Sequence, residues 1–152
     1  MSVTRVPAEL RERVRERANR SCEYCLLAEE QASFGFEADH IIGEQHRGLT
    51  VDENLAWCCF PCNRFKGPNI ASVDPVTGEL ARLFNPRSQI WAEHFQIDAA
   101  QLVPLTPEGR VTVETLKLNS PKRLEVRETL VSLGQYPLRT LSSKTGLRGV
   151  RP

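Results

Sequence analysis

Two Cys-x-x-Cys pairs, Cys22–Cys25 and Cys59–Cys62, constrain this chain more than any other feature. Each pair turns two thiolates toward one point, and two such turns complete a closed tetrahedral zinc site. The 33 residues between the pairs exceed the roughly 15–20 of an ordinary zinc ribbon. We therefore expect one structural Zn²⁺ on Cys22, Cys25, Cys59 and Cys62, with a substantial insertion between the two knuckles.

A redox-active dithiol is the alternative interpretation of a Cys-x-x-Cys pair. Two pairs that flank one module fit a single ion better, and one bound zinc per chain without reactive thiols would exclude the redox protein. Cys58 is the fifth cysteine. It could replace Cys59 only by breaking the spacing, so we expect it to be a buried strand residue.

The composition is that of a globular protein, with 40% hydrophobic and 26% charged residues in 152. This length supports one compact domain, which we place at residues 1–138. No apolar run reaches membrane-spanning length, and residues 1–20 are rich in Arg and Glu. We therefore expect a cytoplasmic protein without membrane contact, in a reducing setting that favours metal ligation over disulfides.

The net charge of +1 conceals basic ends around an acidic centre. Residues 1–20 carry six Arg against three acids, residues 121–152 seven Lys or Arg against two, and residues 21–120 seven basic against fourteen acidic residues. This distribution suits a protein that grips phosphates at its ends and holds cations centrally, although solvated helix faces give the same pattern. We expect residues 139–152 to form a flexible basic tail.

Local patterns predict the order of elements. Apolar residues spaced by four after Pro7 predict a first helix, and the insertion reads as strand, loop, strand and short helix. Turn residues and N-cap signals predict a hairpin and two later helices, the last ended by Gly134. The predicted segments are a helix at 8–20, strands at 37–42 and 55–58, a helix from Asn63, a turn at 74–79, a hairpin around 98–100, and helices near 107–118 and 121–133.

Within the insertion the chain reads Asp39-His40-Ile41-Ile42, then Asn54-Leu55, then Cys-x-x-Cys-Asn63-x-x-Lys66. This order resembles the HNH endonucleases, whose core is the ββα-metal, or His-Me, finger. The resemblance covers Cys22 to Lys66, and Gly43 departs from it where many members carry Pro. It implies an α+β fold: a zinc-stapled ββα-metal finger at 37–66 with an N-terminal helix, a small β-hairpin region and C-terminal helices.

The resemblance also implies roles for individual residues. His40 would be the general base, Asp39 and Asn63 would hold one catalytic divalent cation, and Asn54 would pin the loop and keep the His40 ring oriented. Phosphodiester hydrolysis needs these residue types independently, because imidazole accepts protons near neutral pH and hard oxygen ligands suit Mg²⁺ or Mn²⁺. We therefore expect an endonuclease that acts on DNA.

Each of these residues also has a simpler interpretation. An Asp-His pair is often only hydrogen bonded, and Asn63 could merely cap a helix. His46 could contact phosphate, assist metal binding or lie at the surface without a role. Arg47, Arg64 and Lys66 are candidate phosphate contacts.

Other readings of the whole chain stay open. The alternative function is a non-catalytic zinc-dependent nucleic-acid-binding module, which would not require the combination of Asp39, His40 and Asn63. The DNA target and the biological role are not predicted. Cleavage of both strands would need two active sites, and hence perhaps a dimer, so the oligomeric state is left open. His94 lies outside the motif and is expected to be structural.

Overall fold

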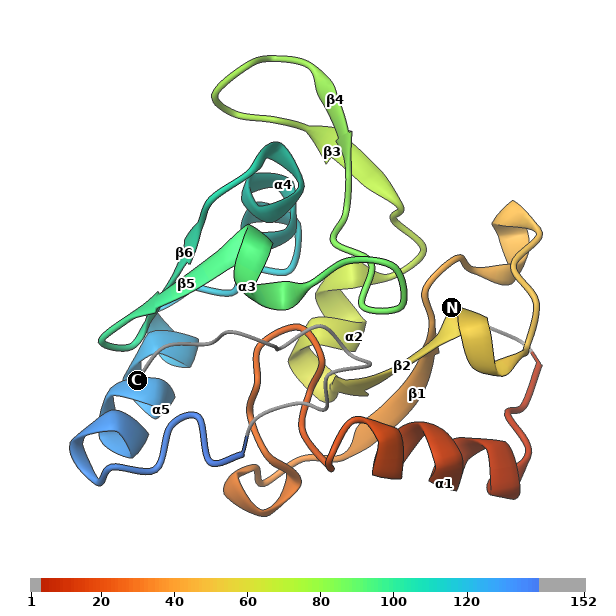
Figure 1. Ribbon diagram of the computed structural model, residues 1–152, viewed down its shortest axis with the longest axis horizontal. Coiled ribbons are helices and arrows are strands. Elements are labelled where there is room, and N and C mark those ends of the chain that lie inside the picture. The colour runs from red at the N-terminus through yellow and green to blue at the C-terminus, as the bar shows by residue number, and fades with distance from the viewer. Residues whose placement is uncertain (1–3, 140–152) are drawn as a thin grey trace.

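The computed structural model describes residues 4–139 as a mixed α+β structure (Figure 1). These residues form five α-helices and three separate two-stranded antiparallel sheets, which confirms the predicted fold class. The helices are α1 (Ala8–Arg17), α2 (Phe60–Lys66), α3 (Trp91–His94), α4 (Pro107–Thr115) and α5 (Pro121–Ser132). The strands are β1 (Phe36–His40), β2 (Leu55–Cys59), β3 (Ala71–Val73), β4 (Leu80–Arg82), β5 (Phe95–Asp98) and β6 (Gln101–Pro104), and short 3₁₀ turns are η1 (Glu29–Gln31), η2 (Glu44–His46) and η3 (Asp52–Asn54).

The insertion folds into a ββα unit. Strand β1 pairs antiparallel with β2, so that Phe36 faces Cys59 and His40 faces Leu55, and β2 continues directly into α2. The strand predicted at 37–42 ends earlier: residue 41 still donates to the Asn54 carbonyl, but the amide of residue 42 donates to the Asn54 side chain instead of the β2 backbone. Helix α2 begins at Phe60, almost one turn before the predicted start, with Pro61 in its first turn.

Helix α1 covers the ββα unit with the apolar stripe that its sequence predicted. Leu10 and Val14 are buried against β1 and β2. The helix ends at Arg17 rather than at the predicted residue 20, because Asn19 and Arg20 both adopt left-handed backbone angles with φ of 57°. That conformation cannot continue a right-handed helix.

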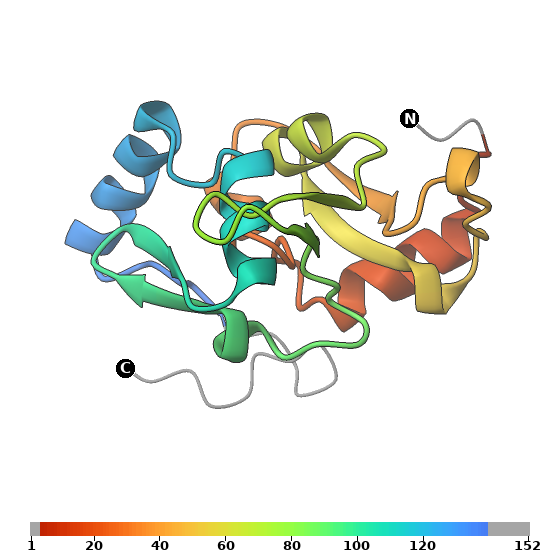
Figure 2. The ribbon, with the colours of Figure 1, turned by 90° about the horizontal axis from the view of Figure 1, so that it is seen from above.

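The downstream elements follow the predicted order. The turn at 74–79 joins β3 to β4, and the hairpin around 98–100 joins β5 to β6. Helix α4 begins after Thr106, whose hydroxyl accepts from the amide of Gly109 at 3.0 Å. In both ribbon views, α1 lies toward one end of the long axis, α5 and the β5–β6 hairpin lie toward the other, and α2 lies between them (Figures 1 and 2).

A single buried cluster joins the two ends. Its largest side chains include Trp57 from β2, Tyr24 from the first knuckle, and Phe84, Trp91 and Phe95 from the downstream half. Phe84 and Phe95 meet edge to face with ring centroids 5.3 Å apart, an arrangement that aromatic pairs favour. The segments upstream and downstream of α2 therefore share one core.

Two sequence predictions concern the ends of the chain. The predicted tail, 139–152, lies outside the described residues except for Arg139, whose guanidinium donates to the Glu30 carboxylate at 2.7 Å. Across residues 4–139, no helix has the length and apolar character needed to cross a membrane.

Candidate active site and four-cysteine cluster

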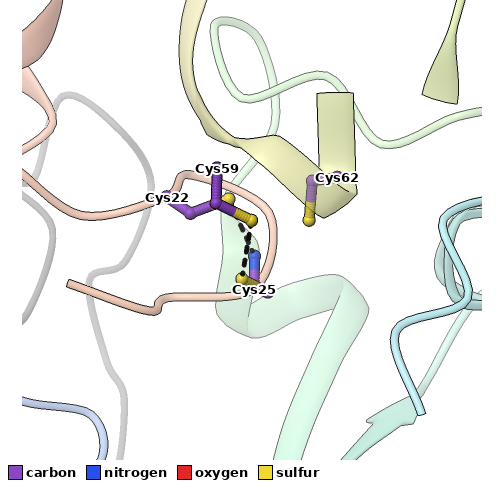
Figure 3. A group of neighbouring side chains, drawn as sticks. All are labelled: Cys22, Cys25, Cys59 and Cys62. Atoms are coloured by element: carbon purple, nitrogen blue, oxygen red, sulfur yellow. Dashed lines mark hydrogen bonds between the residues drawn. The ribbon is translucent and has the colours of Figure 1, made fainter. Parts of the chain in front are cut away.

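The two knuckles bring their sulfur atoms together. The Sγ atoms of Cys22, Cys25, Cys59 and Cys62 all lie within 4.8 Å of one another, and all four residues are buried (Figure 3). Four sulfurs around zinc, at bond lengths of about 2.3 Å, would stand about 3.8 Å apart. The Sγ atoms of Cys25 and Cys59 are 3.7 Å apart. The cluster therefore has the donor set and spacing of a structural zinc site.

Each knuckle is built by a different local structure. In the first, the amide of Leu26 donates to the Cys22 carbonyl at 2.9 Å, and Leu26 adopts a φ of 66° to close the turn. In the second, Cys59 ends β2 and Cys62 lies in the first turn of α2. Cys58 is fully buried in β2 but is not a member of the cluster, as the sequence predicted.

A partly buried arginine from α5, Arg123, contacts the cluster. Arg123 Nη2 lies 2.9 Å from Cys62 Sγ and 3.8 Å from Cys59 Sγ, and its Nη1 donates to the Leu116 carbonyl at 2.8 Å. Burial alone would lower the pKa of Arg123, but the surrounding thiolates raise it well above its ordinary value. Four thiolates around one Zn²⁺ leave a net negative charge, which this guanidinium offsets.

The first knuckle is also held by the downstream half. The indole of Trp91 donates to the Tyr24 carbonyl at 3.0 Å, and the Tyr136 hydroxyl donates to the Cys25 carbonyl at 2.6 Å. Glu23 is fully buried, pairs with the Arg87 guanidinium and accepts from the backbone amide of residue 57. Burial raises the pKa of Glu23 to about 7, against the opposing attraction of Arg87.

A pocket of about 760 Å³ opens on the other side of the ββα unit. Four of the predicted site residues line it: Asp39, His40, Asn63 and Arg64. The remaining candidates Asn54, His46, Arg47 and Lys66 do not. The rest of the wall consists of residues that sequence reasoning did not assign to a site. Some precede β1, some lie in or just after it, and some belong to α2 and the residues that follow it: Thr4, Arg5, Val6, Ala8 and Arg11; Glu37, Ala38 and Gly43; Phe60, Gly67 and Pro68.

His40 lies in the floor of the pocket with its side chain oriented by a threonine. It is 4% exposed, and its Nε2 lies 2.8 Å from the Thr50 hydroxyl. Its backbone carbonyl accepts from Lys66 Nζ at 2.9 Å. Nothing in the local sequence marked Thr50, because the contact depends on how the loop between β1 and β2 folds back.

Asn54 closes that loop with both ends of its amide. Its Oδ1 accepts from the Ile42 amide at 2.9 Å, and its Nδ2 donates to the carbonyls of Ile42 and Leu49 at 2.9 and 2.8 Å. Gly48 passes so close that an added Cβ would lie 1.6 Å from the Ile42 carbonyl oxygen. Only glycine fits at this position of the loop, which carries Thr50 to the His40 ring.

Asp39 is paired with a buried lysine, which corrects the predicted role of Lys66. Lys66 is 2% exposed, and its Nζ lies 2.9 Å from Asp39 Oδ2. An ammonium buried in this way cannot be a surface phosphate contact. Burial raises the pKa of Asp39 and Lys66 opposes that rise. Apart from this ion pair, Oδ2 has no hydrogen-bond partner among residues 4–139.

Asn63 lies inside α2 rather than at its start. The helix is capped at Cys59, so the alternative that Asn63 serves as the helix cap is wrong. Asn63 lines the pocket, and Arg64, the next residue, is exposed at its edge. Asp39 and Asn63 thus line one cavity, and both side chains carry oxygen atoms of the kind that Mg²⁺ and Mn²⁺ prefer.

The other candidates lie away from the pocket. His46 and Arg47 are exposed on and after η2, so their predicted contacts stay predictions. His94 packs in the downstream half, where its Nδ1 lies 2.6 Å from the Thr106 hydroxyl.

Comparison with known proteins gives one match. Residues 22–69 match the model of the family described as HNH endonuclease. No curated protein and no solved structure matches the chain. The matched residues run from the first knuckle through α2 and include Asp39, His40, Asn54 and Asn63. By sequence, therefore, residues 22–69 match the HNH endonuclease family, and this segment contains the ββα unit and all four cysteines of the cluster.

Proposed function

We propose that this protein is a metal-dependent endonuclease that hydrolyses DNA phosphodiester bonds. The observation that carries the proposal is the convergence of Asp39, His40 and Asn63 on one open pocket, in the segment that matches the HNH family. A base and hard oxygen ligands beside one another are what water-driven phosphodiester cleavage requires. The exposed arginines of the same pocket suit a phosphate backbone.

His40 acts as the general base. In this scheme Nε2, which lies 2.8 Å from the Thr50 hydroxyl oxygen, carries the ring proton and donates to that oxygen. Nδ1 is then the unprotonated nitrogen that accepts a proton from the attacking water. Asn54 holds the loop that carries Thr50 and so acts on His40 through that residue. Thr50 and Asn54 are positioning residues in this scheme.

Asp39 and Asn63 hold the catalytic cation. When bound, Mg²⁺ or Mn²⁺ neutralises charge on the phosphoryl oxygens and on the leaving oxygen. Asp39 fits this role because its carboxylate lines the same pocket as Asn63. Lys66 stabilises the ionised carboxylate at 2.9 Å, which keeps a charged ligand available in a buried position.

The four-cysteine cluster has a structural role in this proposal. Thiolates prefer Zn²⁺ whereas the oxygen pair prefers Mg²⁺ or Mn²⁺, so the two sites sort different ions. The cluster has no open ligand position, as expected of a structural site.

Nicking of supercoiled plasmid tests the proposal. The zinc-loaded protein should convert supercoiled to open-circular DNA with Mg²⁺ or Mn²⁺ and not with EDTA. His40→Ala should lose about a hundredfold or more in rate, the usual contribution of a general base, while its zinc content and thermal unfolding stay unchanged. Asp39→Ala and Asn63→Ala should be partly rescued by raised Mn²⁺, which should not help His40→Ala.

His94→Ala is the matched control, because it removes an imidazole outside the pocket and should leave the nicking rate intact. A protein that binds plasmid but cuts it in no metal would support the alternative, a non-catalytic zinc-dependent nucleic-acid-binding module. Near wild-type cutting by His40→Ala would reject His40 as the base.

A further inference from the structure

The pocket has a second wall that lies outside the family match. An N-terminal arm, residues 4–7, and the start of α1 form this wall. The arm is fixed across the pocket by Thr4, whose backbone amide donates to Glu44 Oε1 at 2.8 Å and whose hydroxyl also donates to that carboxylate. Because Thr4 is anchored in this way, the neighbouring residue Arg5 is held beside the pocket.

Helix α2 presents one continuous face to the same pocket. Phe60, Asn63, Arg64 and Gly67 all line it, at the i, i+3, i+4 and i+7 spacing of a single helical stripe. Cys62 and Lys66 occupy the opposite, buried face. The stripe thus places an aromatic ring beside the cation ligand Asn63 and an arginine.

Phe60 is exposed where a structural phenylalanine would be covered. It is 49% exposed, whereas Phe36, opposite the start of α2 on β1, is 5% exposed. An exposed ring in a pocket offers a flat apolar surface on which a nucleobase can stack. Phe60 precedes Asn63 by three residues in α2, so the stacking surface lies within one helical turn of the proposed cation site.

The charges around Phe60 favour a phosphate. Within residues 4–139, the side chains of Arg5 and Arg64 form no hydrogen bond or ion pair. Arg11 is already engaged, since it donates to the Phe36 carbonyl at 3.0 Å and lies over the Trp57 ring. The acidic residues of the wall are Asp39, which is paired with Lys66, and Glu37, which is exposed on β1. Two guanidinium groups that have no partner among residues 4–139 therefore line the same pocket as the ring.

We propose that Arg5, Phe60 and Arg64 form a nucleotide subsite, in which an unstacked nucleobase packs on Phe60 and the adjoining phosphate pairs with Arg5 and Arg64. In duplex DNA both faces of each base are covered by its neighbours, so this subsite takes a strand that is unpaired next to the scissile phosphate. The inference rests on the proposed function and specifies its substrate: single-stranded DNA, or duplex with locally unpaired bases.

Binding to the cleavage-deficient His40→Ala protein, loaded with zinc, tests the subsite by fluorescence anisotropy. A short labelled single strand should bind more tightly than the matched duplex. Phe60→Leu keeps an apolar side chain without a ring and should weaken single-strand binding roughly 5- to 100-fold, the usual loss when one stacked base is released. Phe34→Leu is the matched control, because Phe34 is 38% exposed but does not line the pocket.

Two further variants assign the parts of the subsite. In a second experiment, one abasic nucleotide is placed at each position of the single strand in turn. At one position, this strand should bind the protein that retains Phe60 as weakly as the intact strand binds Phe60→Leu. The loss from the missing base and the loss from the missing ring should not add, because both remove the same contact. Arg5→Gln and Arg64→Gln should each reduce the slope of log affinity against log salt by about 0.7, the value for one phosphate contact on a single strand.

The outcomes separate this inference from the proposed function. Wild-type plasmid nicking decides the nuclease, whatever Phe60 does. Equal affinity for single strand and duplex, with no loss in Phe60→Leu, would overturn the subsite and leave the nuclease intact. A loss in Phe60→Leu that is as large for duplex as for single strand would also overturn it, because the ring would then act as a wedge between paired bases.

Discussion

Helix α2 contributes residues to two sites, one buried in the protein and the other open to solvent. Its inner face carries Cys62, which is fully buried, belongs to the four-cysteine cluster and contacts Arg123. Its outer face carries Phe60, Asn63 and Arg64, which line an open pocket. The Cys62 sulfur on the inner face is surrounded by other protein side chains, whereas the Phe60 and Arg64 side chains on the outer face are exposed to solvent.

The difference separates stability from function along one helix. A thiolate zinc site supplies on the order of 10 kcal/mol or more to folding, so the inner face can hold α2 in place almost alone. The outer face is then free to keep an exposed ring and unpaired charges that would not stabilise a fold. We expect damage to the cluster to unfold the protein and damage to the pocket to spare the fold.

The largest expected effect comes from the cluster. Cys22→Ser should abolish zinc binding and destabilise the fold severely, because the site loses one of four ligands and contributes on the order of 10 kcal/mol. Cys58→Ser is the matched control: Cys58 is equally buried but lies outside the cluster, so the change should act only through packing. Bound zinc and thermal unfolding measure both. If the wild-type protein is fully folded without zinc, the cluster is not needed for stability, and the proposed division between a stabilising site and a functional site is wrong.

A smaller effect is expected from the loop that positions His40. Gly48→Ala puts a methyl group 1.6 Å from the Ile42 carbonyl oxygen, so the loop must shift and the Asn54 bonds must open. A displacement of about 1 Å at a catalytic group can cost roughly a hundredfold in rate. Plasmid nicking should fall accordingly, while bound zinc stays at one per chain.

Gly43→Ala is the control for that loop, because no atom lies within 4 Å of the position its Cβ would take. Hydrogen exchange at the Ile42 amide gives a readout independent of cleavage and should quicken in Gly48→Ala alone. Unchanged exchange and unchanged nicking in Gly48→Ala would show that the loop does not orient His40.

The smallest effect tests how the cluster is supported. Arg123→Met removes the guanidinium that contacts Cys62 Sγ at 2.9 Å and should speed zinc loss to a chelator about tenfold, the lower end for a group that hydrogen-bonds a metal ligand. Arg127→Met is the matched variant, since Arg127 is buried on the same helix but bonds only to oxygen atoms, among them the Ala100 and Leu118 carbonyls. Equal zinc loss in both variants would assign the effect to α5 packing rather than to the thiolate contact.

Local spacing predicted those parts of the molecule that local structure builds. The four cysteines, the β1–β2 hairpin and the helix that carries Asn63 each follow from residues close in sequence. The β5–β6 hairpin and helices α4 and α5 followed from turn and cap residues in the same way.

Contacts between distant segments were not predictable in this way. Lys66 follows Asn63 by three residues and reads as a second pocket residue, but its chain turns inward to the Asp39 carboxylate. Thr4 contacts Glu44, and Arg123 contacts Cys62, although each pair is far apart in sequence and no local pattern connects its members. The second wall of the pocket and the support of the cluster were missed for that reason.

The hydrogen bonds to the first knuckle affect whether the segment that matches the HNH family can be exchanged between proteins. Carbonyls of Tyr24 and Cys25 receive their side-chain donors from Trp91 and Tyr136, far outside the family match. A gene fragment that encodes only residues 22–69 would carry the proposed catalytic groups, but it would leave these acceptors without their donors and the buried Glu23 without Arg87. Recombination can therefore transplant this motif into a new host protein only together with a downstream segment that covers the knuckle.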